Sequence, residues 1–166
     1  MTASSRWGLR PRDSIEAECG RRGAAAVIAG CIRLARGDDA DPALILALGG
    51  PAAGRFLAGP PRPDNHSIEL PRPDNHLARL PRPDSYWLRV WGLRGLLWVW
   101  DDSAAPVAVA ALADEAWRVR EMAAKVAARH LVGEALPVLA SIRGDPVERV
   151  RRATDRAIRV LTGAGA

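Results

Sequence analysis

The chain has 166 residues, of which 48% are hydrophobic and 26% charged, and its formal net charge at pH 7 is +5. This composition is ordinary for a globular protein, and the length favours a single domain. The most apolar stretch, residues 86–100, contains Arg89 and Arg94 and is shorter than the roughly 20 residues that span a bilayer. We therefore expect no membrane segment.

Basic residues and cysteines add two further limits. Lys125 is the only lysine, and the richness in Arg, Ala, Gly and Pro resembles a coding bias, which weakens any inference from charge to nucleic acid. The first ten residues contain no apolar signal-peptide core, so we expect a cytoplasmic protein. Cys19 and Cys31 are predicted to lie in one helix, roughly 18 Å apart, which excludes a disulfide between them and predicts free thiols.

Helix signals dominate the part of the chain before the proline-rich segment, and we find no clear strand pattern. A helix is expected over residues 13–36, beginning at Asp13 or Ser14 and ending at Gly37. A shorter helix is expected after Asp41, ending where the sequence reads Gly-Gly-Pro, with a weak helical turn around Phe56. Residues 1–58 are interpreted as an N-terminal helical cap or as degenerate repeats.

Residues 61–90 consist of three similar decapeptides, each beginning Pro-Arg-Pro-Asp, and residues 59–83 are interpreted as a proline-rich loop. Proline disfavours helix in the residue before it, so the first two copies are predicted to form a loop, and Asp84 of the third is predicted to cap the next helix. We favour a tandem duplication as the origin of the repeated decapeptides, in a loop that tolerates added length. A proline-rich ligand for an aromatic groove, or a metal site at His66 and His76, are the alternatives.

The helix expected from residue 84 to residue 100 is apolar nearly all round and holds four of the six tryptophans. A helix without a polar face is a buried helix, so these tryptophans are predicted to be core residues. Asp101, Asp102 and Ser103 then offer N-caps for the following helix.

The last third of the chain repeats itself at a fixed spacing. Pro106 aligns with Pro137, Asp114 with Asp145, and the run Arg-Val-Arg at 118–120 with the same run at 149–151. A constant period of about 30 residues is typical of a solenoid of stacked helical units. Antiparallel helix pairs are expected at 103–113/115–130 and 133–143/146–161.

These spacings resemble the HEAT-repeat family, which has a proline early in its first helix, an aspartate in the turn and a Val-Arg pair in its second helix. The resemblance implies an all-α superhelix of antiparallel helix pairs over residues 84–162, with the proline-rich segment as an inserted loop. It also implies structural roles, in which Asp114 and Asp145 cap helices and Arg120 and Arg151 pair with the aspartate of a neighbouring unit. Upstream, Arg89-Val90 aligns with Arg118-Val119. This alignment puts Trp91 at the position of Arg120, the arginine expected to pair with the aspartate of a neighbouring unit in a ladder of ion pairs.

No catalytic motif, cofactor motif or metal-ligand cluster is recognisable, so the chain is predicted not to be an enzyme. We expect a binding scaffold for a protein partner. The alternative is a nucleic-acid-binding HEAT-like protein, including an enzyme that resembles the HEAT-like DNA glycosylases, for which Trp98, Trp100, Asp101, Asp102 and Trp117 supply the residue types. The predicted partner site is a basic strip on two neighbouring helices, consisting of Arg118, Lys125, Arg129, Arg149, Arg152, Arg156 and Arg159.

Overall fold

The computed structural model describes residues 10–58 and 86–163. These residues form eight α-helices and no strand, so the predicted all-α class is confirmed for this part of the chain. The helices are α1 (Pro11–Arg22), α2 (Ala24–Ala35), α3 (Pro42–Ala58), α4 (Tyr86–Leu96), α5 (Ala105–Ala111), α6 (Trp117–Arg129), α7 (Leu136–Ser141) and α8 (Glu148–Thr162). None of them is long and apolar enough to cross a membrane.

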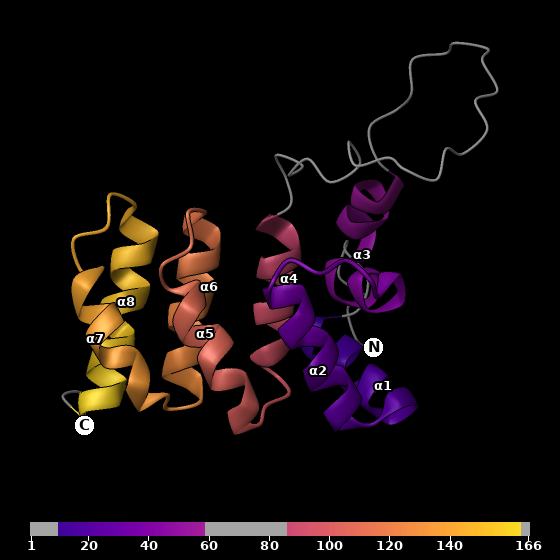
Figure 1. Ribbon diagram of the computed structural model, residues 1–166, viewed down its shortest axis with the longest axis horizontal. Helices are drawn as coiled ribbons and strands as arrows, with labels where there is room; N and C mark the ends of the chain where they lie inside the picture. Colours follow the sequence, from indigo (N-terminus) through magenta and orange to yellow (C-terminus); the bar gives the residue numbers. More distant parts are fainter. Residues whose placement is uncertain (1–9, 59–85, 164–166) are drawn as a thin grey trace, which may run out of the picture.

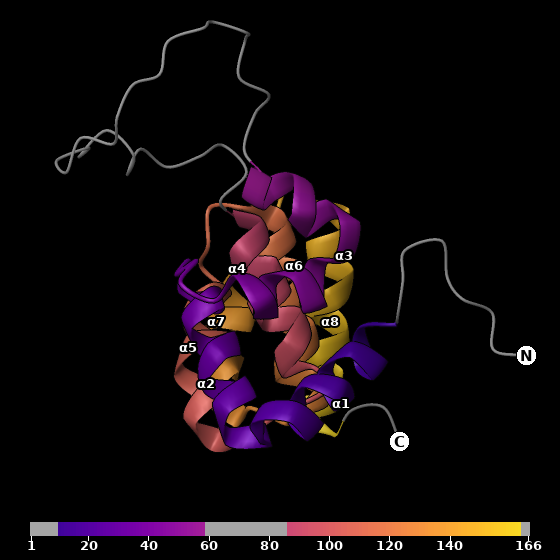
Figure 2. The same cartoon turned by 90° about the vertical axis from the view of Figure 1, so that its right-hand side faces the viewer.

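Most of the helices lie in two layers (Figures 1 and 2). The first layer places α4, α6 and α8 side by side, and the second contains α2, α5 and α7. Each helix of the first layer packs against one helix of the second, so the pairs are α2 with α4, α5 with α6, and α7 with α8. The first pair is therefore interrupted in the sequence by α3 and by residues 59–85.

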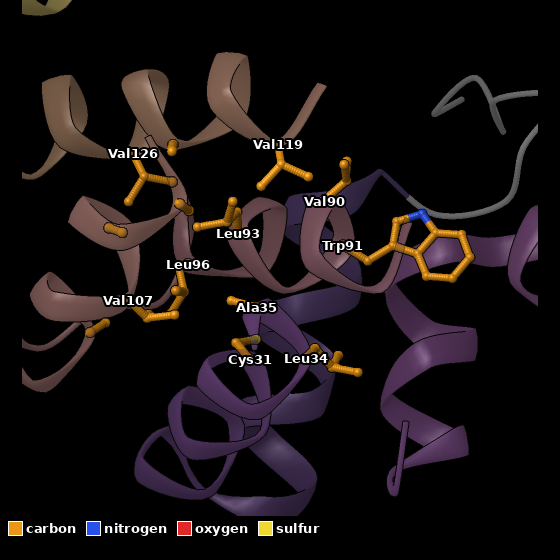
Figure 3. Packing of buried hydrophobic residues seen from close by; sticks show 14 of the residues in the cluster. Cys31, Leu34, Ala35, Val90, Trp91, Leu93, Leu96, Val107, Val119 and Val126 are labelled. Carbon is orange, nitrogen blue, oxygen red and sulfur yellow. The ribbon is translucent and has the colours of Figure 1, made fainter. Parts of the chain in front are cut away.

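Helix α4 is surrounded because α1, α2, α3 and α6 all pack against it. Figure 3 shows Leu93 and Leu96 of α4 between α6 and α2, with Trp91 directed toward α3. A helix with neighbours on every side needs apolar residues on every side, which explains its sequence. Two glycines let α2 approach closely, since a Cβ at Gly92 would lie 2.5 Å from both the Ala35 nitrogen and the Cys31 oxygen, and one at Gly95 would lie 2.5 Å from the Cys31 sulfur.

The prediction of one helix over residues 13–36 is wrong. Gly23 separates α1 from α2 and has φ 85° and ψ 146°, a conformation that a residue with a side chain rarely adopts. Helix α1 begins at Pro11, not at Asp13 or Ser14. Cys19 and Cys31 therefore lie in different helices, although both are free thiols. Burial raises the pKa of Cys31 to about 12, which keeps that thiol protonated and unreactive at neutral pH.

Asp41 fixes the start of α3 and ties it to α1. Its Oδ1 accepts a hydrogen bond from the Leu44 N–H at 3.0 Å, and both of its carboxylate oxygens accept from the Arg22 guanidinium, at 2.6 and 3.2 Å. The hydrogen bond from Arg22 is the main reason that the pKa of Asp41 lies below its usual range. The chain kinks at Gly50, where the sequence predicts the end of the helix, and the helix continues from Pro51. The helical turn predicted around Phe56 is therefore the second part of this kinked helix.

The tryptophans of the 86–100 region are not all core residues. Trp91 is buried at 3% exposure, whereas Trp98 is 39% exposed. Trp100 stacks on the His130 ring with centroids 4.3 Å apart, and His130 Nε2 lies 2.8 Å from the Leu96 carbonyl oxygen. Helix α4 ends at Leu96, earlier than predicted, so the last tryptophans lie in the turn before the next pair. Asp101 Oδ1 accepts from the Ser103 N–H at 2.8 Å, as a capping residue does.

Leu131 follows α6 with a φ of 55°, the one non-glycine residue with positive φ in residues 10–58 and 86–163. Its side chain is 65% exposed, so it gains little from burial. We predict that Leu131→Gly raises the free energy of unfolding by about 0.5–1 kcal/mol, because glycine removes the cost of the left-handed conformation. The midpoint of urea unfolding measures this change. A lower midpoint would show that the partly covered leucine side chain contributes more than the backbone costs.

Candidate binding groove

A ladder of ion pairs joins the three helix pairs. Arg89 Nε lies 2.7 Å from Asp114 Oδ2, and Arg120 Nε lies 2.7 Å from Asp145 Oδ2. The spacing between the two arginines equals the spacing between the two aspartates, which is the repeat period. Arg89 is therefore the ladder arginine of the first pair, and the alignment that put Trp91 at this position is wrong by two residues. The same period thus extends upstream into α4.

The two aspartates shape turns and do not cap helices, contrary to the prediction. Asp114 Oδ1 accepts from the Ala116 N–H at 2.8 Å, and Asp145 Oδ1 accepts from the Val147 N–H at 2.8 Å. The N-caps of α6 and α8 are Ala116 and Val147, and neither makes a side-chain capping bond. Each aspartate lies two residues before the N-cap and accepts from the N–H of the N-cap residue itself, so it stabilises the turn that precedes the helix.

Arg120 and Arg151 close the same turns from the helix side. Arg120 Nη1 donates to the carbonyl oxygens of Asp114 and Glu115, and Arg151 Nη1 donates in the same way to those of Asp145 and Pro146. Arg120 also reaches the next pair through Asp145. No carboxylate lies within ion-pair distance of Arg151 in the part of the chain that the structure describes.

Aromatic rings and arginines alternate along the first turns of α4, α6 and α8. The Arg118 guanidinium lies 4.3 Å from the centroid of the Trp117 ring and 5.5 Å from that of Trp87, and the Arg149 guanidinium lies 5.6 Å from the Trp117 ring. Trp87, Arg118 and Arg149 occupy equivalent positions in the three pairs, one repeat period apart. These contacts are worth roughly 0.5–1 kcal/mol each at partly exposed sites, so both arginines have a structural role between helices.

An open groove of about 760 Å³ lies along α6 and α8 and reaches the end of α4. No residue of α5 or α7 lines it, which places it on the outer face of the layer formed by α4, α6 and α8. Its apolar lining comes from Leu97, Trp98, Ala128, Ala153 and Val160. Its charged lining comes from Glu121, Lys125, Arg129, Arg149, Arg152 and Arg156.

Three of the five groove cations already have carboxylate partners. Glu121 is 8% exposed and accepts from Lys125 Nζ at 2.7 Å and Arg149 Nη2 at 3.2 Å. Arg152 pairs with Glu148 one turn away, at 2.6 Å. Arg129 lies over Trp98, with its guanidinium 4.6 Å from the ring centroid. Neither Arg129 nor Arg156 has an ion-pair partner among the residues that the structure describes.

The structure divides the predicted basic strip. Lys125, Arg129, Arg149, Arg152 and Arg156 line the groove. Arg118 lies outside the groove, among the aromatic rings of Trp87 and Trp117. Arg159 is exposed but is not part of the groove lining. Asp84 lies outside the described residues. The predicted strip does not include Trp98 and Val160, which are 39% and 43% exposed. Trp98 is predicted to be a core residue or, in the glycosylase-like alternative, a functional residue, because apolar residues on a predicted helix are usually buried.

No group of three metal-ligating side chains occurs in residues 10–58 and 86–163. His66 and His76, the histidines of the possible metal site, lie outside this part, as do the first two decapeptide copies and the first half of the third. The remaining histidine, His130, has its pKa lowered by burial, so its ring is neutral at pH 7. It lies against Trp100 and the end of α4, outside the groove lining.

Comparisons of the chain with family models, curated proteins and solved structures found no match.

Proposed function

We propose that this chain is a HEAT-like binding module without catalytic activity, and that its groove along α6 and α8 holds an acidic segment of a partner protein. The observation that carries the proposal is the composition of the groove, which combines five cations and one carboxylate with five apolar residues. Acidic side chains would pair with the cations while apolar side chains would cover the apolar part of the lining.

The HEAT resemblance is supported by the spacing of the ladder. Arg89 and Arg120 each bind the aspartate found 25 residues further along the chain, and each of these contacts links one helix pair to the next. Stacked pairs joined by a repeated contact are the arrangement expected of a solenoid, whose exposed layer commonly binds partners.

A protein partner fits the groove better than a duplex does, because apolar side chains make up much of its lining and carboxylates neutralise three of its cations. Nucleic-acid binding draws mainly on cations that are free to contact phosphates. The nucleic-acid alternative keeps one supporting observation, which is the pair of cations, Arg129 and Arg156, that have no carboxylate partner in the described part.

The test compares two fluorescein-labelled probes, an amphipathic peptide of Glu and Leu and a duplex DNA of the same net charge. We predict that the peptide binds and that Arg152→Glu combined with Arg156→Glu weakens its binding at least tenfold, measured by fluorescence anisotropy. Arg36→Glu combined with Arg55→Glu makes the same charge change at exposed positions outside the groove. This control should change the affinity less than threefold.

The salt dependence separates the two classes of partner. Duplex binding weakens with log salt at a slope of about −0.9 for each phosphate neutralised. Tighter binding of the duplex than of the peptide at 150 mM salt, about physiological ionic strength, would reject the protein-binding proposal in favour of the nucleic-acid alternative. Equal loss of peptide binding in the groove variant and the control would show that net charge, and not the groove, attracts the peptide.

A further inference from the structure

The two ends of the groove differ in whether their cations are paired with a carboxylate. At the end where α6 and α8 begin, Glu121 is nearly buried and pairs with both Lys125 and Arg149. This carboxylate occupies the place that an acidic side chain of a partner would otherwise take. A new anion at this end could bind Lys125 or Arg149 only in competition with Glu121, so the gain in ion pairing is small.

At the other end, two cations are accessible and two apolar side chains are exposed. Arg129 and Arg156 are exposed and have no carboxylate partner in the described part of the chain. Trp98 and Val160 line the same end and keep 39% and 43% of their surface exposed. The Trp98 ring holds the Arg129 guanidinium 4.6 Å from its centroid, which orders the cation without neutralising it.

We infer that this end, formed by Trp98, Arg129, Arg156 and Val160, is the anion subsite of the groove, and that it recognises a carboxylate next to a large apolar side chain in a peptide segment. Glu121 sets the direction of binding because it excludes acidic side chains from the opposite end. The inference rests on the proposed function and adds to it which residues select the ligand.

The recognised segment follows from this geometry. Its apolar side chain covers Trp98 and Val160, and its carboxylate accepts hydrogen bonds from Arg129 and Arg156. Arginine suits this contact because its planar guanidinium offers several donors to the two carboxylate oxygens. A segment whose acidic residues are spread along its whole length gains less, since those facing Glu121 meet a like charge.

The experiment uses the full chain and two labelled peptides of equal net charge. One carries its glutamates beside a single Leu-Trp pair at one end, and the other spreads its glutamates evenly. The variants are Arg129→Gln and Arg156→Gln at the proposed subsite, Lys125→Gln and Arg149→Gln at the Glu121 end, and Glu121→Gln. Arg55→Gln, at an exposed position outside the groove, is the control.

We expect Arg129→Gln and Arg156→Gln to weaken binding of the clustered peptide at least tenfold, and Lys125→Gln and Arg149→Gln to weaken it less than threefold. Glu121→Gln should strengthen binding of the evenly charged peptide about threefold or more, because Lys125 and Arg149 become available. A purely structural role of Glu121 would not produce that gain. Thermal unfolding followed by circular dichroism identifies any variant that fails to fold.

The outcomes separate the two proposals. If neither peptide binds the parent chain, the proposed function fails. If both peptides bind and all four cation variants lose affinity equally, the groove binds acidic segments but the anion subsite is wrong. Weaker binding of both peptides by Glu121→Gln would also overturn the subsite, because it would make Glu121 part of the recognition surface.

Discussion

Replacing Gly92 by alanine is expected to lower the free energy of unfolding by about 2–3 kcal/mol. A Cβ at this position would meet the Ala35 nitrogen and the Cys31 oxygen, each at 2.5 Å, and the Leu34 Cβ at 2.9 Å. Two of these atoms belong to the backbone of α2, so no side-chain rotation relieves the clash and the two helices must move apart. That movement disturbs the contact between α4 and the α2 helix that pairs with it.

Gly20→Ala is the matched control for this prediction. Gly20 lies in α1, and a Cβ there would have no neighbour within 4 Å. Alanine is a better helix former than glycine, so this variant should be more stable by about 0.5 kcal/mol. Urea unfolding followed by circular dichroism measures both variants. A Gly92→Ala protein as stable as the parent would show that α2 and α4 do not pack this closely in solution.

Loss of the ladder aspartate should have the other large effect. Asp145→Ala is expected to cost about 3 kcal/mol, because it removes the partner of Arg120 and the acceptor for the Val147 N–H. Asp145 keeps only 4% of its side-chain surface exposed and Arg120 keeps 14%, so water replaces the lost contacts poorly. Asp145→Asn retains an acceptor for the turn and should cost about half as much, since it loses only the charge.

The ladder also makes stability depend on pH. Burial acts to raise the pKa of Asp145, but the hydrogen bond from Arg120, the Val147 N–H and the nearby arginine charges outweigh it and lower the pKa. A carboxyl group with a lowered pKa stabilises the fold above its unfolded pKa of about 3.9, and this stability is lost as the pH falls through the folded value. Unfolding midpoints between pH 5 and pH 2 should therefore fall less in Asp145→Asn than in the parent. Parallel curves would contradict the ion pair.

The sequence by itself determined the helical class and the periodic part of the chain. The repeat spacing is visible without coordinates because each unit repeats the same local requirements, an aspartate in the turn and an arginine in the first turn of the helix that follows. The apolar character of α4 also predicted its burial, since every face of that helix meets a neighbour. Pro42 predicted the start of α3 for a purely local reason, because proline suits the first position of a helix, and the Asp41 side chain caps the helix there.

Tertiary packing decided the rest. The break at Gly23 depends on α1 folding back beside α2, α3 and α4, and nothing in a helical pattern distinguishes a glycine that breaks a helix from one that packs inside it, such as Gly92. The pairing of α2 with α4 across the whole of α3 and residues 59–85 has no local signal. Which groove cations are paired depends on the distances between side chains in space. Glu121 pairs with Lys125 on its own helix and with Arg149 on the neighbouring helix α8. Two arginines of the predicted strip, Arg129 and Arg156, therefore have no carboxylate partner among the described residues, whereas a third, Arg149, pairs with Glu121.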